Sequence, residues 1–337
     1  MNILKIVLSN RKWLTCILVF VTVNAAHGQT CLTADDMDAA TKSALTTTAR
    51  NYFGMAARGD SASLRQNAIP SLASDFSSVE TAVSDHKAEF AGAQANPRPP
   101  FLLRAQGTAP LARAEFLCGV FGANGQTATS SEFVIPNLPP GEYGIVILDV
   151  PTAKQPYTVS FVLQHEGTAW KLGGFFVRET QTKGHDGDWF ATRAREFKAK
   201  GQTHNAWLYL QQARELISPV PFMYTLRTDK LYEEAQTVKP PDMPTEGSPV
   251  DLSAGGKTYK LTSVFPLLVD KDLDLVVKYQ SADVSDTTKT FQDNVALMKA
   301  LVAKFPELRD AFDGVVARAV EPSGRDYGTL LAMKDIK

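Results

Sequence analysis

The first 28 residues constrain this chain most, because they predict which residues fold and in which compartment. Lys5, Arg11 and Lys12 form a basic start, an apolar run of ten residues follows over 14–23, and Ala26-His27-Gly28 supplies the small residues that a signal peptidase recognises. A run of ten is far shorter than the ~20 residues that a membrane-spanning helix needs. The segment 1–28 is therefore predicted to be an export signal rather than a membrane anchor, with the mature chain starting near Gln29.

Export would leave a mildly acidic chain in a compartment that permits disulfides. Removing three basic residues from the 35 Lys and Arg leaves 32 against 36 Asp and Glu, a net charge of about −4. A nucleic-acid partner would need a basic surface, so this class is not expected. Cys31 and Cys118 remain after Cys16 is removed, and we expect them to form a disulfide, with two free buried thiols as the alternative. The localisation expected is periplasmic or extracellular.

Two polar stretches rich in Gly and Pro divide the mature chain. The first is Thr180–Asp188, and the second runs from Lys239 to Gly256. The predicted organisation is an α+β domain over 29–180, a helical hairpin over 187–235, a Pro- and Gly-rich linker over 236–256, and a β-β-α-β-β domain over 257–337. The fold class is therefore α+β, with a helix and a curved antiparallel sheet first, a helical connector next, and a small second sheet domain last.

Within 29–180, apolar residues recur at helical spacing from Met37 to Ala56 and then alternate in strands from Pro100 onward. A long helix, the break Ala57-Arg-Gly-Asp60, further helices and antiparallel strands ending in Trp170-Lys-Leu-Gly-Gly-Phe-Phe176 resemble the nuclear transport factor 2-like fold, in which a curved sheet wraps on helices. The turn Pro139-Pro-Gly-Glu-Tyr143 also resembles turns of transthyretin-like β-sandwiches, and this alternative stays open.

The resemblance to the nuclear transport factor 2-like fold implies a pocket between the long helix and the sheet. His165 continues the alternating face of Phe161 and would be the polar group at its mouth; packed core residues with His165 exposed are the alternative. The residues expected to line the pocket are Tyr52, Phe53, Phe161, Leu163, His165, Trp170 and Leu172.

The later segments carry fewer signals. Small and large residues alternate from Trp189 to Pro219 as in one tetratricopeptide-like hairpin, which needs a neighbouring domain to pack on. Over 257–337 we recognise no family, but a helix is expected over Thr287–Lys304, capped by Ser285 or Asp286. Its order favours one helix over a small antiparallel sheet.

No catalytic or metal signature emerges from the sequence. Asp270, Asp272 and Asp274 resemble the start of a calcium loop, but Leu275 stands where Gly is needed, so a solvated hairpin with Asp274 facing outward is expected. Asp186 and Asp188, which follow His185, predict a helix cap rather than a metal site. No metal or cofactor is predicted.

The sequence favours an exported, non-enzymatic binding or scaffolding protein with an unknown protein or small-molecule partner. The alternative is an exported enzyme of hydrolase or isomerase type that uses a pocket in 31–180.

Overall fold

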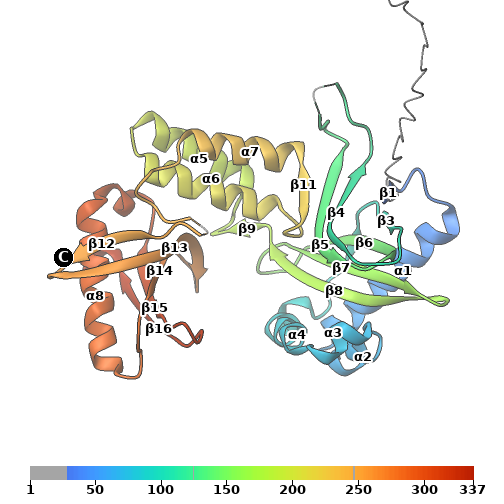
Figure 1. Ribbon diagram of the computed structural model, residues 1–337, viewed down its shortest axis with the longest axis horizontal. Helices are drawn as coiled ribbons and strands as arrows, with labels where there is room; N and C mark the ends of the chain where they lie inside the picture. The colour runs from blue at the N-terminus through green and yellow to red at the C-terminus, as the bar shows by residue number, and fades with distance from the viewer. Residues whose placement is uncertain (1–28, 124, 246) are drawn as a thin grey trace, which may run out of the picture.

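The computed structural model describes residues 29–123, 125–245 and 247–337, and the predicted export signal at 1–28 lies outside these residues. The α+β class is confirmed: helices and largely antiparallel sheets occur together. Two sheet-containing units flank a group of three helices, α5 to α7 (Figure 1). The first unit contains the candidate site.

Four helices cover one face of the first unit's main sheet. The long first helix begins at Asp38, whose carboxylate accepts a hydrogen bond from the Thr41 backbone at 2.8 Å. It ends before Gly59, which adopts the left-handed conformation that glycine tolerates best. The helices are α1 (Ala39–Ala57), α2 (Ser61–Gln66), α3 (Pro70–Ser74) and α4 (Ser77–Phe90).

The main sheet of this unit is antiparallel, with the order β1-β3-β6-β7-β8 and the short β2 paired to β6. Its other face packs on a smaller sheet with the order β11-β5-β4. The main strands are β1 (Gln29–Leu32), β2 (Asn96–Pro97), β3 (Phe101–Ala105), β6 (Gly141–Val150), β7 (Tyr157–Glu166) and β8 (Ala169–Glu179). The smaller sheet contains β4 (Leu111–Cys118), β5 (Ser131–Leu138) and β11 (Met223–Thr225).

A disulfide joins the two sheets, as the cysteine count predicted. It links Cys31 in β1 to Cys118 at the end of β4, with the two Cα atoms 5.1 Å apart. Cys118 is buried in the core between the sheets. The bridge therefore fixes the edge of one layer to the other.

The helical segment is tied to both neighbours. The three helices are α5 (Gly187–Ala199), α6 (Thr203–Ile217) and α7 (Leu226–Thr237), preceded by the short strands β9 (Gln181–Thr182) and β10 (His185–Asp186). The helical segment expected over 187–235 is interrupted at Met223–Thr225, which forms β11 and pairs with β5 of the first unit before α7 begins. Residues of α5 to α7 share one apolar core with the C-terminal sheet.

Polar contacts also hold α6 to the C-terminal unit. His204, near the start of α6, contacts Glu307 through Nδ1 at 2.6 Å and Asp242 through Nε2 at 2.9 Å. His185 stacks on Trp189 while the Asp186 carboxylate caps α5. The Asp186 cap agrees with the expectation for the acidic residues near His185, and the contacts of His204 are structural as well.

The C-terminal sheet has the order β12-β13-β14-β15-β16, with the helix α8 on one face. Its elements are β12 (Val250–Ala254), β13 (Lys257–Val269), β14 (Asp272–Gln280), α8 (Thr287–Lys304), the 3₁₀ helix η1 (Pro306–Asp310), β15 (Gly314–Val320), β16 (Asp326–Ala332) and η2 (Met333–Asp335). Two expectations need correction. β12 lies inside the predicted linker 236–256, and β14 pairs with β15 in parallel, so the sheet is mixed. The parallel pair follows from α8, which returns the chain to the edge where β14 began.

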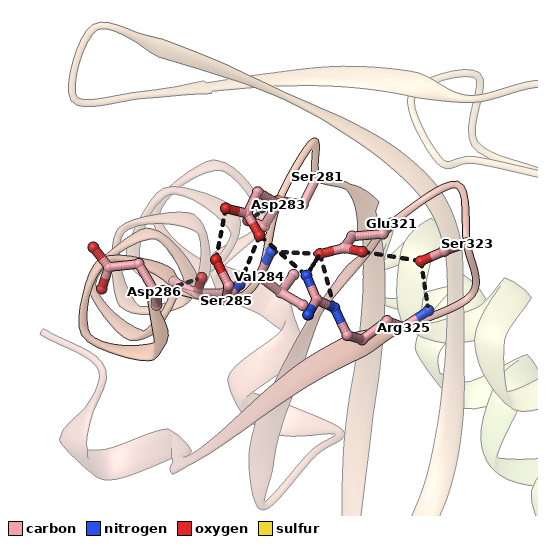
Figure 2. A network of polar contacts seen from close by, with 9 residues as sticks. Ser281, Asp283, Val284, Ser285, Asp286, Glu321, Ser323 and Arg325 are labelled. Carbon is pink, nitrogen blue, oxygen red and sulfur yellow. Dashed lines mark hydrogen bonds and ion pairs between the residues drawn. The ribbon is translucent and has the colours of Figure 1, made fainter.

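A polar network connects the start of α8 to the β15–β16 hairpin (Figure 2). Asp286 caps the helix by accepting a hydrogen bond from the Lys289 backbone at 3.0 Å. Arg325 contacts Glu321 at 2.6 Å and Asp283 at 3.1 Å, and Glu321 also accepts from the Val284 backbone. These contacts satisfy backbone groups at the helix start, which is a structural role.

Asp274 does not face solvent as expected. It lies in the central strand β14 between β13 and β15, and only 3% of the residue is exposed. Burial, together with the negative charges of Asp272 and Asp313, raises its pKa to about 6. The Asp-x-Asp-x-Asp pattern indicated a polar turn, but Asp274 lies inside β14, where the neighbouring strands β13 and β15 flank it.

Replacing Asp274 with Asn should stabilise the protein at pH 7. The folded-state pKa of about 6 lies above the ordinary value of 3.8, so the stability contributed by the protonated form is complete below the lower value. It is lost as the pH rises through about 6. We expect Asp274→Asn to raise the free energy of unfolding by about 1–2 kcal/mol at pH 7 and to change it little near the lower pKa.

Denaturant unfolding of the wild type and of Asp274→Asn across this pH range measures the difference. Asp251→Asn, at an exposed position on β12, is the control and should leave the pH dependence unchanged. A variant with Asn at 274 that is no more stable than the wild type at pH 7 would contradict the expectation.

Candidate ligand-binding site

The residues predicted to line a pocket between the long helix and the sheet instead fill the space between these elements. Tyr52, Phe53, Phe161, Leu163 and Leu172 are all buried in one apolar core, in which Trp170 also packs. The Tyr52 hydroxyl donates a hydrogen bond to the Trp170 carbonyl at 2.9 Å. These residues therefore form packed core, which was the alternative that the sequence left open.

His165 lies apart from this core. It is exposed at the end of β7, where its ring packs at a tilt against Trp170 and Nδ1 lies 3.5 Å from a Glu142 carboxylate oxygen. Glu142 is itself held by Arg104 at 2.8 Å. The geometry therefore gives no support to His165 as the polar group of an enclosed pocket.

An open cavity of about 520 Å³ lies on the opposite face of the same strands. This volume falls within the range of roughly 300–1,000 Å³ that is typical of ligand sites. Its floor comes from the β7–β8 hairpin, and its walls come from the start of α3, the end of β5, Tyr143 of β6 and the segment before β11. The apolar and aromatic residues that define it are Ile69, Ile135, Tyr143, Val162, Phe176 and Phe222.

A bulge shapes the floor. Val162 pairs with Gly174 but Leu163 pairs with Leu172, so Gly173 is an extra residue in β8. A Cβ atom at Gly174 would come within 3.1 Å of the Phe176 ring, whereas one at Gly173 would make ordinary contacts of 3.4 Å or more. The glycine pair thus brings backbone rather than side chains to the floor.

Contacts among the lining residues hold the walls of this cavity in place, and few of the lining side chains are polar. The Tyr143 hydroxyl donates to the Pro139 carbonyl at 2.8 Å, and burial raises the pKa of Tyr143, so this phenol stays neutral. Phe176 packs edge-on against Phe222 with ring centroids 5.6 Å apart. Ser71, Gln164 and Glu166 provide the polar side chains of the lining, and Glu166 also forms an ion pair with Lys171 at 3.4 Å.

The residues expected to line a pocket and the residues that line this cavity lie on opposite faces of β7. Phe161, Leu163 and His165 alternate with Val162, Gln164 and Glu166, and the second set lines the cavity. Strand alternation separates two faces, but it does not say which of them packs on the helices when both are apolar. The adjacent glycines in Trp170-Lys-Leu-Gly-Gly-Phe-Phe176 were the available signal, because glycine inside a strand marks a bulge or a close approach.

Two other cavities carry mixed charge. A cavity of about 530 Å³ near His185 includes Lys183 and Asp313, which pair at 2.6 Å. A cavity of about 780 Å³ includes Arg195 and Glu234, which also pair at 2.6 Å. These two pairs neutralise part of the charge of each cavity. Within residues 29–123, 125–245 and 247–337, no group of His, Cys, Asp or Glu side chains is arranged to hold a metal ion.

Comparisons with known proteins leave the chain without an assigned relative: no family model, no curated protein and no solved structure matches it. The resemblances to nuclear transport factor 2-like and tetratricopeptide-like folds therefore stay predictions. Among the described helices, none has both the length and the apolar character needed to cross a membrane.

Proposed function

We propose that this chain is an exported, non-enzymatic binding protein that takes up a small, mainly apolar molecule in the cavity over β7 and β8. The observation that carries the proposal is the cavity itself, because its aromatic and aliphatic walls are partly exposed around a backbone floor. Leaving such surface open costs free energy that a bound apolar molecule would offset.

The polar groups suggest how the ligand is oriented. Gln164 offers an amide donor and acceptor, and Glu166 a carboxylate, from the same strand face at one end of the cavity. A ligand with a ring or short hydrocarbon body and one polar end fits this arrangement. The inter-sheet disulfide supports the export part of the proposal, since such bridges persist in oxidising compartments.

The alternative of an exported hydrolase or isomerase has less support. Catalysis by proton transfer needs an acid or base held close to the reacting group in the pocket. His165 is exposed outside the cavity, and no histidine occurs among its described lining residues. We therefore favour binding without chemistry.

A leucine at position 173 should block the cavity. The backbone there is outside the left-handed region and a Cβ meets no close contact, so Gly173→Leu can fold while its side chain fills the space above the floor. Titration with the apolar fluorophore N-phenyl-1-naphthylamine should show saturable binding to the wild type. We expect affinity at least about tenfold weaker in Gly173→Leu, a loss of about 1.4 kcal/mol.

Ala169→Leu is the matched control, because it adds the same side chain at an exposed position of β8 outside the cavity. It should bind the fluorophore as the wild type does. Circular dichroism of both variants verifies that they are folded. Absence of saturable binding to the wild type, or equal binding by a folded Gly173→Leu variant, would refute the proposal.

A further inference from the structure

Among the described helices, none shares an apolar core with the second face of the C-terminal sheet. On the first face, α8 packs against β12, β15 and β16, α6 contacts β13, and alternate residues of the central strands, such as Leu275, Val277 and Ala317, join the core. Val276 points the other way: it is buried, yet it belongs to none of the apolar clusters of the described residues. The sheet therefore has a second, separate apolar face, which we call the open face.

A straight row of apolar side chains crosses the open face. Phe265 of β13 is opposite Val276 of β14, Val276 is opposite Val316 of β15, and Val316 is opposite Leu330 of β16. Leu330 is 48% exposed, and Leu267, one position along the face from Phe265, is 45% exposed. Large apolar side chains gathered in register on a surface indicate an interaction site.

Charged residues are placed symmetrically about this row. Lys278 lies two residues after Val276 on β14, with its ammonium 5.6 Å from the centre of the Phe265 ring. Asp274 lies two residues before Val276 on the same face, over Gly314 and beside Leu330. Only 3% of Asp274 is exposed, and the positive charge of Lys183, which is paired with Asp313, also acts on its carboxylate. Arg318 is paired with Asp326 at 2.6 Å.

We propose that the open face binds the open face of a second copy of this chain, with a two-fold axis along the row from Phe265 to Leu330. Rotation about that axis reverses the strands, so Lys278 of each copy lies over Asp274 of the other. The pattern is thus self-complementary, which a two-fold interface requires. Rotation about an axis along the strands would instead bring Lys278 toward Arg318, and like charges would repel.

The area of the open face is large enough to bind a second copy of this chain. Five strands about 4.8 Å apart and about 27 Å long give roughly 600 Å² on each copy, or roughly 1,200 Å² in total. This is the low end for specific interfaces, so a reversible dimer is expected. The ligand cavity lies in the other sheet-containing unit (Figure 1), so each copy would keep its own cavity.

Sedimentation of the mature chain between about 1 and about 100 μM tests the association, because interfaces of this size commonly dissociate in the micromolar range. The average mass should rise toward that of a dimer with concentration. Leu330→Lys should remain monomeric throughout. Leu117→Lys, which changes a leucine on β4 of the other unit that is 59% exposed, should associate as the wild type does. A wild type that stays monomeric, or association that survives Leu330→Lys, would overturn the proposal.

Crosslinking tests the axis. Residues on the axis face their own counterparts, so the thiols of Val316→Cys should be joined by a short bis-maleimide in most chains. Ser263→Cys lies two residues off the axis on the same face, so its two copies would be about 13 Å apart along the strand direction and should link little. Equal linking of both variants, or preferential linking at 263, would contradict this arrangement.

Discussion

Loss of the Cys31–Cys118 bridge is expected to lower the free energy of unfolding by about 4 kcal/mol, the largest effect of any change considered for this chain. The bridge joins residues 87 apart in sequence, so the oxidised unfolded chain has far fewer conformations than the reduced one. It also holds the edge strand β1 against β4. Without it, the two layers of the first unit are held by their apolar contacts and by the hydrogen bond from the Glu115 backbone to the Gln29 side chain.

Denaturant unfolding of the mature wild type, with and without reductant, and of the Cys31→Ala/Cys118→Ala variant measures this loss. Cys118 is fully buried, so its replacement also removes packing atoms. Reduction of the wild type leaves those atoms in place and isolates the effect of the crosslink. An unfolding midpoint that is the same with and without reductant would show that the bridge contributes nothing.

Replacement of Asn294 with Ala should destabilise the C-terminal unit by about 3 kcal/mol. Asn294 projects from α8 toward the sheet and is fully buried. Its carbonyl oxygen accepts a hydrogen bond from the Tyr279 hydroxyl at 2.8 Å, and its amide donates to the Thr329 hydroxyl at 2.9 Å. Alanine would leave both hydroxyls buried without these partners, which typically costs about 1–3 kcal/mol for each group.

The same denaturant experiment measures this change, and Gln292→Ala serves as its control because Gln292 lies on the exposed side of α8. The Asn294→Ala, Tyr279→Phe double variant should recover part of the loss, since it removes one of the stranded hydroxyls. An Asn294→Ala protein as stable as Gln292→Ala would mean that these hydrogen bonds are replaced by water.

Local patterns predicted the helices well. α8 has the predicted bounds, because its apolar spacing is regular and a capping residue precedes it. The β13–β14 hairpin also appears where alternation and the turn at Asp270 placed it. In such segments the information lies within a few residues, so the sequence alone can carry it.

The other features depend on contacts between residues that are far apart in the sequence. β11 has only three residues, and it forms a strand because β5 offers an unpaired edge more than 80 residues earlier. Asp274 is buried because β15 adds to the far side of β14, which no local signal announces. The pocket was expected on the face of β7 that packs on the helices for a related reason, since both faces are apolar and each is covered by a different layer.

The first unit includes the short strand β11, so a chain that is cut near residue 180 does not contain the whole unit. A chain ending there would leave β5 with an unpaired edge, which invites strand-to-strand aggregation. It would also lack Phe222, and with it one wall of the cavity. The Phe222 carbonyl accepts a hydrogen bond from the Val134 backbone of β5 at 3.0 Å, so the segment after α6 completes the cavity while it is fixed to the first unit.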